Sequence, residues 1–145
     1  MTFKILKTQN QDGIFTITIS RPEALNALNT AFFDEMDHLL DDISNDDSVK
    51  IIIITGEGKA FVAGADIAEM VNKNSIEGTE FSVRGQKVFR KMEHLDKPII
   101  AAINGFEQLD DIPGIQQWNF SLKLGERVNK ITDSLDRYGY AIFQA

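Results

Sequence analysis

The spacing of apolar side chains changes along the chain, and each spacing predicts a different element. Over residues 14–20, apolar positions alternate with Thr16 and Thr18, which is the two-residue period of a pleated strand. Residues 3–8 predict a shorter strand, and the polar segment 9–13 between the two predicts a turn. Together these segments predict an antiparallel hairpin at the start of the chain.

After Pro22 the apolar spacing becomes helical. We expect a helix that begins at Asn29 or Thr30, since both residue types cap helix starts. The polar run 44–48 ends it. Its apolar face consists of Phe32, Met36, Leu39, Leu40 and Ile43.

Two continuous apolar runs, 49–55 and 99–103, predict strands that are buried on both faces of a parallel sheet. A short helix over 67–71 and a longer helix over 80–95 lie between them, and Pro98 ends the second. Strands that alternate with helices predict right-handed βαβ crossovers and an α/β fold. The apolar face of the longer helix consists of Phe81, Val88, Phe89, Met92 and Leu95.

The last part of the chain has a different character. Residues 107–119 show no clear period, whereas 124–138 carry apolar residues at helical spacing and 140–143 form a short apolar run. We therefore predict an α/β domain with an N-terminal hairpin, largely parallel strands, a C-terminal helix and a possible last strand.

Composition narrows the class of protein. The chain has 145 residues, of which 43% are apolar, and a formal net charge of -7, which fits one compact acidic domain. The acidic charge argues against a nucleic-acid partner, and the absence of cysteine excludes disulfides and thiolate metal sites. His38 and His94 have no ligand partner at metal spacing, so no metal is predicted. No apolar run is long enough to span a membrane, and we expect a cytoplasmic protein.

The segment 56–66 is the candidate for chemistry. A buried strand ends there, and a loop of small residues leads into the short helix. In open α/β sheets, ligands bind outside the carboxyl ends of the strands, and small residues let a ligand approach the backbone. The alternative is a tight strand-to-helix turn that needs small residues for packing. On this segment alone we favour the turn.

Three segments together resemble a known family. They are 58–67 (GKAFVAGADI), 21–28 (RPEALNAL) and 97–106 (KPIIAAINGF), and they occur in the expected order. Residues 1–106 are similar to the acyl-CoA-binding half of the crotonase (enoyl-CoA hydratase/isomerase) superfamily. The resemblance implies a truncated form of that fold, built from ββα/βαβ units, with residues 107–145 packed on the same domain as a tail that resembles nothing we recognise.

The resemblance implies hydration of a trans-2-enoyl-CoA, with the thioester carbonyl between two backbone N–H groups. The N–H of Ala65 would be the first, whereas we interpret Asp66 mainly as the N-cap of the next helix. Coenzyme A enters as part of the acyl-CoA substrate, so no separate cofactor is implied, and a homo-oligomer is expected. The implied contacts to the substrate come from Glu23, Ala24, Leu25, Ala27, Lys59, Ala60, Phe61, Ala63, Gly64, Ala65, Asp66 and Ile67.

The sequence departs from the family pattern after Phe106. The family has a Gly-rich stretch and a catalytic Glu there, whereas this chain reads EQLDDIPG over 107–114. Ungapped counting puts Asp110 at the second oxyanion position and Pro113 at the catalytic Glu, which predicts impaired hydratase activity.

Three origins of the tail stay open. It is a foreign or artificially joined segment, a natural divergent completion of the domain, or a rebuilt active site. In the last case Glu107, Asp110 and Asp111 supply the acid and base, although a solvated acidic loop is the interpretation we favour for them. The alternative to a weak hydratase is a non-catalytic, self-associating or engineered fragment of the fold.

Overall fold

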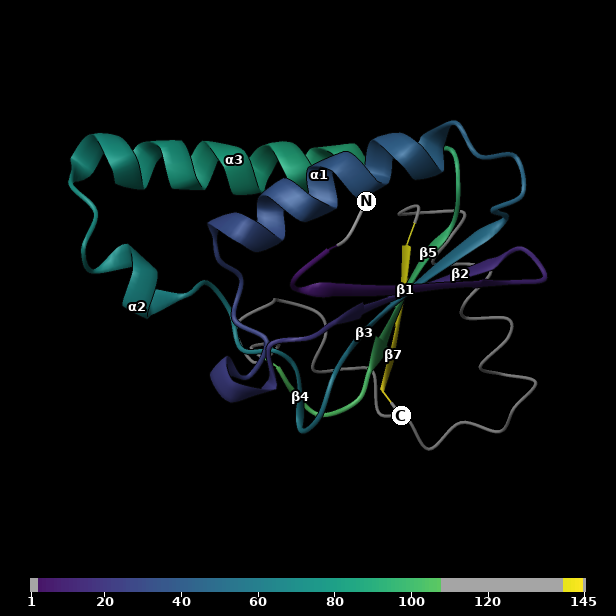
Figure 1. Ribbon diagram of the computed structural model, residues 1–145, viewed down its shortest axis with the longest axis horizontal. Helices are drawn as coiled ribbons and strands as arrows, with labels where there is room; N and C mark the ends of the chain where they lie inside the picture. Colours follow the sequence, from purple (N-terminus) through teal and green to yellow (C-terminus); the bar gives the residue numbers. More distant parts are fainter. Residues whose placement is uncertain (1–2, 108–139, 145) are drawn as a thin grey trace.

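The computed structural model describes residues 3–107 and 140–144. After an initial hairpin, helix α1 comes between β2 and β3, and helices α2 and α3 come between β4 and β5 (Figure 1). The elements are β1 (Leu6–Gln11), β2 (Ile14–Ile19), the 3-10 helix η1 (Pro22–Ala24), α1 (Thr30–Ser44), β3 (Ile51–Gly56), β4 (Ala60–Val62), α2 (Ile67–Met70), α3 (Ser75–Glu93), β5 (Ile99–Ile103), β6 (Phe106–Glu107) and β7 (Tyr140–Gln144).

In the described part of the chain, the main sheet has five strands in the order β1-β2-β3-β5-β7. Among the strands of residues 3–107 and 140–144, β1 runs antiparallel to its neighbour β2, and β2, β3, β5 and β7 are parallel. A second sheet pairs β4 with β6 in parallel. The predicted α/β class with a hairpin and largely parallel strands is therefore confirmed, as is a short strand near the end of the chain.

The hairpin is tighter than the sequence analysis predicted. Asp12 and Gly13 both have positive φ angles, 52° and 87°. Two such residues form the type of turn whose twist matches a two-residue hairpin, so β1 extends to Gln11. It also begins later than predicted, at Leu6, and the N–H groups of Lys4, Ile5 and Leu6 donate to the Glu35 carboxylate. The predicted strand 3–8 and turn 9–13 are both corrected by this geometry.

Helices α1 and α3 cover the same face of the main sheet (Figure 1). The predicted apolar face of α1 is fully buried there, and Ile17 and Ile52 from the sheet are 0% exposed. Asn29 caps α1, since its side chain accepts a hydrogen bond from the N–H of Phe32 at 2.9 Å. The hydrophobic core thus lies between one face of the sheet and two helices.

Helix α3 begins at Ser75, earlier than the predicted residue 80. Asn74 and Glu77 form a capping box, in which each side chain accepts from the other's backbone N–H. The apolar period starts only at Phe81 because the first turn of α3 is exposed, with Ile76 70% exposed. Phe89 is also 45% exposed, so it does not belong to the buried face as predicted.

Ion pairs fasten α3 to α1 on the outer side. Arg84 pairs with Asp34, and Lys87 with Asp37 at 2.7 Å, each across 50 residues of sequence. The equal separation shows that the two helices run parallel. Hydrogen bonds from Lys87, which has the larger effect, and from Lys91 to the Asp37 carboxylate hold the pKa of Asp37 below its usual range. These ion pairs therefore fix α3 relative to α1, and both helices pack beside the sheet whose strand ends carry the loops.

The two central strands are buried on one face rather than on both. In β3, buried Ile52 and Ile54 alternate with half-buried Ile51 and Ile53. In β5, Ile99 and Ile103 are buried and the residues between them are half-buried. The predicted strands therefore have one buried face, whereas described side chains on the other face, such as Ile51 and Ile53, are half-buried and not fully buried as predicted.

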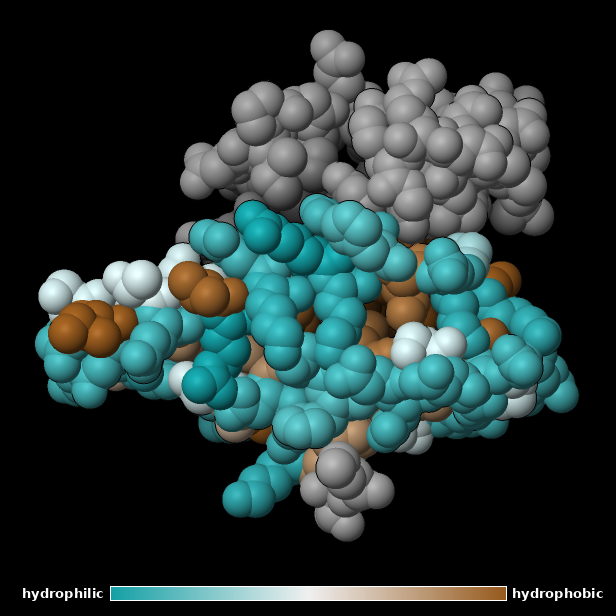
Figure 2. Space-filling view, turned by 90° about the horizontal axis from the view of Figure 1, so that it is seen from above, coloured by the Kyte–Doolittle hydropathy of each residue, from teal (hydrophilic) through white to brown (hydrophobic). Residues whose placement is uncertain are grey.

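Hydrophobic side chains gather on the surface at the end of the molecule where α2 and α3 begin (Figure 2). Ile67 and Val71 are each 76% exposed. The helix predicted over 124–138 lies outside the described residues. Within the described part of the chain, no helix is long and apolar enough to cross a membrane.

Candidate functional site

Three loops follow the carboxyl ends of three parallel strands and meet at one edge of the sheet. Residues 20–29 follow β2, residues 57–66 follow β3 and surround β4, and residues 104–105 follow β5. Parallel strands bring such loops together because all their carboxyl ends face the same edge. The candidate site is therefore built from the three segments that carry the family resemblance.

Asn26 holds the first loop against the second. Its side chain is 0% exposed and all its hydrogen-bonding groups are used. Oδ1 accepts from the N–H of Arg21 at 2.8 Å, while Nδ2 donates to the carbonyls of Glu57 and Ala60 at 2.9 and 2.8 Å. Leu25 and Asn26 both have left-handed backbone angles, with φ of 50° and 57°, and Asn tolerates that region better than most residues.

Asn104 and two glycines hold the third loop against the second. Asn104 accepts from the N–H of Gly56 at 3.2 Å and donates to the carbonyl of Gly58 at 3.0 Å. A side chain on Gly105 would place Cβ 2.1 Å from the carbonyl oxygen of Lys59, and one on Gly56 would place it 2.2 Å from that of Ala60. Glycine is thus required at both positions for the backbones to approach.

The first and second loops also join through their backbones. The N–H of Ala63 donates to the carbonyl of Leu25 at 3.1 Å. The N–H of Leu28 then donates to Gly64, and that of Asp66 to Leu28, both at 2.8 Å. Leu28 and Ala65 consequently form a parallel β-bridge. The two predicted substrate-contacting segments therefore run side by side.

The bridge determines which way the Ala65 N–H points. In a parallel bridge, the partner strand bonds to the residues on either side, here Gly64 and Asp66. The N–H of Ala65 itself faces away from Leu28 and has no acceptor among residues 3–107 and 140–144. Ala65 as a whole residue is exposed.

Asp66 occupies the N-cap position predicted for it. Its side chain is 12% exposed, and Oδ1 accepts from the N–H of Glu69 at 3.1 Å. Oδ2 accepts from Nη1 of Arg21 at 2.9 Å. The cap is confirmed, and the ion pair to Arg21 was not predicted.

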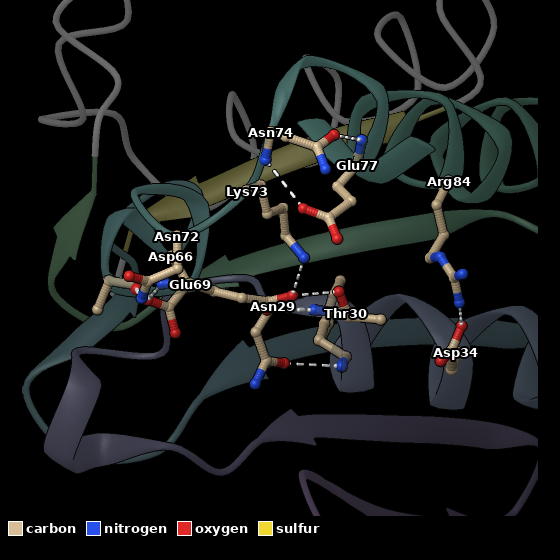
Figure 3. A network of polar contacts seen from close by, with 12 residues as sticks. Asn29, Thr30, Asp34, Asp66, Glu69, Asn72, Lys73, Asn74, Glu77 and Arg84 are labelled. Atoms are coloured by element: carbon tan, nitrogen blue, oxygen red, sulfur yellow. Dashed lines mark hydrogen bonds and ion pairs between the residues drawn. The ribbon is translucent and has the colours of Figure 1, made fainter. Parts of the chain in front are cut away.

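Helix α2 is fastened to α1 through Glu69 (Figure 3). Its carboxylate accepts from the N–H of Thr30 at 2.8 Å, from the Thr30 hydroxyl and from Lys73 at 2.8 Å. Partial burial favours the neutral acid, but the hydrogen bonds from Lys73 and Thr30 outweigh it and lower the pKa of Glu69 to about 2. Glu69 is therefore a structural anion that is charged at neutral pH.

The remaining predicted residues lie as follows. Glu23 and Ala24 belong to η1, while Ala27 lies between Asn26 and the bridge. Ala60, at the start of β4, is 1% exposed and pairs with Phe106. The backbone of Glu107 pairs with Val62, which brings it to the edge that carries Ala65. Asp110 lies outside the described residues.

The two histidines are surface residues. Nδ1 of His38 and Nδ1 of His94 each lie 2.7 Å from the carbonyl oxygen of the residue four positions earlier. Both are exposed. Residues 3–107 and 140–144 contain no group of three or more His, Asp or Glu side chains arranged to hold a metal ion.

Comparison with known families supports the same region. The family model described as enoyl-CoA hydratase/isomerase matches residues 9–108, which is more than half of the chain and includes all three loops. The chain belongs to the enoyl-CoA hydratase/isomerase family. A short-chain-enoyl-CoA hydratase of Clostridium acetobutylicum is 52% identical over 99 residues, and a crotonyl-CoA hydratase of Syntrophomonas wolfei is 43% identical over 107 residues.

Solved structures of this family share the fold. The chain is similar to an enoyl-CoA hydratase from Bacillus anthracis, with a TM-score of 0.69 at 29% identity, over 70% of this chain and 40% of that one. An enoyl-CoA hydratase from Thermoplasma volcanium gives 0.64 at 28% identity, over 68% and 40%. The chain covers 38% of the Clostridium relative and 41% of the Syntrophomonas relative, and the matches cover 68% and 73% of this chain.

The C-terminal third has a similarity of its own. A second family model, described as L-amino acid ligase C-terminal domain 2, matches residues 96–145. The two matches share 96–108, which contain β5. The sequence analysis did not find this second similarity. It begins at residue 96, before the hydratase pattern is lost after Phe106, and it extends to residue 145.

Sequence reasoning also missed the residues that hold the loops together. Asn26 lies within a motif that resembles the family, but nothing in the local pattern shows that its partners are 31 and 34 residues away. Arg21 and Asp66 are separated by 45 residues. Two features could have been found from the local sequence. The spacing of Asn74 and Glu77 fits a capping box that begins α3, and Gly105 directly after Asn104 fits a close backbone contact.

Proposed function

We propose that this chain binds short-chain acyl-CoA thioesters and polarises the thioester carbonyl with the N–H of Ala65. The observation that carries the proposal is the direction of that N–H, which the Leu28 bridge turns away from the first loop. A backbone N–H aimed at an acyl oxygen stabilises the negative charge that develops there. The 52% identity to a short-chain-enoyl-CoA hydratase supports this ligand class.

The coenzyme A part of the ligand would lie along the first two loops. Glu23, Ala24, Leu25 and Ala27 line the first, and residues 59–67 line the second. Leu25 is 45% exposed and Ile67 is 76% exposed, so both present apolar surface to a ligand. The backbone contacts between the loops hold these groups in a fixed relation before a ligand arrives.

Turnover is expected to be weak or absent. Hydration of an enoyl thioester needs a second oxyanion donor and an acid or base that activates water. By the family resemblance, residue 110 is Asp where a glycine donor is expected, and residue 113 is Pro where a Glu is expected. Proline carries no proton that it can exchange, and an ionised Asp repels a developing oxyanion.

A second candidate function is that of a non-catalytic, self-associating domain. It is favoured by the similarity of residues 96–145 to another family, because that segment stands where the hydratase machinery would follow. Exposed Ile67, Val71 and Ile76 provide apolar surface at one end of the molecule. Such a domain would keep the fold and bind no thioester, or bind it without turning it over.

Calorimetric titration and a turnover assay separate these functions. Acetoacetyl-CoA is titrated into the chain with free coenzyme A as the control, and crotonyl-CoA hydration is followed by the loss of enoyl-thioester absorbance. Binding of both ligands with little hydration is the expected result. Hydration that disappears in Glu107→Gln or Asp110→Asn would show a rebuilt active site. Failure of both ligands to bind, with a stable oligomer in sedimentation, would favour the second candidate.

A further inference from the structure

The two oxygens of the Asp66 carboxylate make different contacts, one to a helix backbone and one to an arginine side chain. Oδ1 accepts the Glu69 N–H at 3.1 Å and so caps α2, whereas Oδ2 accepts from Nη1 of Arg21 at 2.9 Å. The Asp66 side chain is 12% exposed and that of Arg21 is 18% exposed. A four-residue helix needs a cap, but it does not need a nearly buried arginine from another loop.

Arg21 connects this carboxylate to the far side of the first loop. The same Nη1 atom that meets Asp66 also donates to the carbonyl of Ala27 at 2.7 Å. Ala27 directly precedes Leu28, which bonds to the residues on either side of Ala65. The guanidinium therefore closes a ring that runs from Asp66 through Arg21 and Ala27 to the Leu28 bridge and back to Ala65.

Ala65 is one member of this ring, and contacts on two sides determine its orientation. The backbone bridge holds Gly64 and Asp66 on the Leu28 side, and the ion pair holds the Asp66 side chain on the Arg21 side. Gly64 has a φ of 106°, so the peptide before Ala65 relies on surrounding contacts to keep its direction. Rotation of Ala65 would have to break contacts on both sides.

We propose that Arg21 and Asp66 form a positioning pair that sets the direction of the Ala65 N–H toward the thioester carbonyl. This inference rests on the proposed function. Burying an ion pair gives little net stability, because the loss of hydration offsets the attraction, but it does select one geometry. A fixed donor direction is what oxyanion stabilisation requires, since an error of about 1 Å in placement is costly.

Asp66→Asn separates positioning from helix capping. An asparagine keeps a side-chain oxygen for the Glu69 N–H, so the cap survives, but it loses the charge that holds Arg21. Arg21→Gln removes the charge from the other side, and Arg21→Lys keeps a cation but not the rigid fork. Arg84→Gln is the matched control, because Arg84 pairs with Asp34 on the outer surface of α3 and α1.

The readout is the infrared carbonyl band of bound butyryl-CoA that is isotope-labelled at its thioester carbonyl. A directed N–H polarises the carbonyl and lowers its frequency, and this shift is measured on saturated complexes, so affinity does not enter. In the intact chain we expect a lower band than in free butyryl-CoA. Asp66→Asn and Arg21→Gln should move it back toward the free value, with Arg21→Lys between, while Arg84→Gln leaves it unchanged.

Affinity is measured alongside, and it should weaken by roughly tenfold or less in Asp66→Asn, as for the loss of one hydrogen bond. Circular dichroism checks that each variant is folded, and the Arg21 variants decide the question if Asp66→Asn is not. A shifted band that stays the same in every folded variant would overturn the positioning role alone. If the intact chain binds no butyryl-CoA, or binds it without a band shift, the proposed function fails and this inference with it.

Discussion

Leu28 and Ala65 form a parallel β-bridge that joins two loops from different strands of the sheet. The bond from the Leu28 N–H to Gly64 and the bond from the Asp66 N–H to Leu28 are both 2.8 Å long. One consequence is structural, since the loop after β3 cannot move independently of the loop after β2. The other is chemical, since the Ala65 N–H is left facing outward from the bridge.

Asn26 should be the most sensitive polar residue of the site. Asn26→Ala leaves the Arg21 N–H and the carbonyls of Glu57 and Ala60 without their buried partner, and it puts Ala at a φ of 57°. We expect a loss of at least about 2 kcal/mol in the free energy of unfolding. Chemical denaturation measures it. Asn72→Ala, at an exposed residue with one 3.2 Å bond to Ala68, should change stability by less than about 0.5 kcal/mol.

Gly105→Ala tests the close approach of the third loop. The added Cβ would lie 2.1 Å from the Lys59 carbonyl oxygen, so the turn between β3 and β4 must move away from the end of β5. We expect a loss of about 2–3 kcal/mol in unfolding free energy and weaker binding of acetoacetyl-CoA. Gly78→Ala is the control, because nothing lies within 4 Å of its added Cβ in α3, and it should stabilise the fold by about 0.5–1 kcal/mol. Equal effects of the two substitutions would refute the steric argument.

Glu69 should make the fold sensitive to acid. Its pKa is about 2 in the folded protein and 4.5 in the ordinary carboxyl, so the unfolded chain takes up the proton first as pH falls. The stability from this group is complete above about pH 4.5 and disappears as pH falls toward about 2. With the side chain 27% exposed, the contribution is on the order of 2 kcal/mol.

Unfolding free energies of the intact chain and of Glu69→Gln, measured between these pH values, test this expectation. The two curves should differ most above pH 4.5 and converge toward pH 2. Thr30→Ala should reduce the gap, because it removes the hydroxyl that donates to Glu69. A gap that stays constant with pH would show that the carboxylate acts through packing and not through its charge.

Periodicity alone predicted the elements of the sheet and its two helices, because these patterns are local. Ile14 to Ile19 alternate as a strand, and Asn29 marks a helix start by its own chemistry. The continuous apolar run 49–55 did not distinguish the buried face of β3 from its half-buried face, because Ile occupies every position from 51 to 54 whichever way the side chain points. The start of α3 was also missed, because its first turn is exposed and does not follow the apolar period.

The family resemblance predicted the site segments that are continuous in sequence, but not the contacts between residues that are distant in sequence. The loop 58–67 matches a family segment as written, whereas Asn26, Asn104 and the pair of Arg21 with Asp66 act across more than 30 residues. Such contacts depend on which strands become neighbours. An Asn in a loop has the same sequence signature whether it is buried with three bonds or exposed with none.

The central claim is that the Ala65 N–H, and not the loop as a whole, recognises the acyl carbonyl. Ala65→Pro removes this one donor, while Ala65→Gly keeps it and serves as the control. Both variants and the intact chain are titrated with acetoacetyl-CoA and with free coenzyme A. We predict that only Ala65→Pro loses the preference for acetoacetyl-CoA, by roughly tenfold or more, with unchanged coenzyme A binding. An Ala65→Pro variant that still prefers acetoacetyl-CoA as strongly as the intact chain would contradict the account.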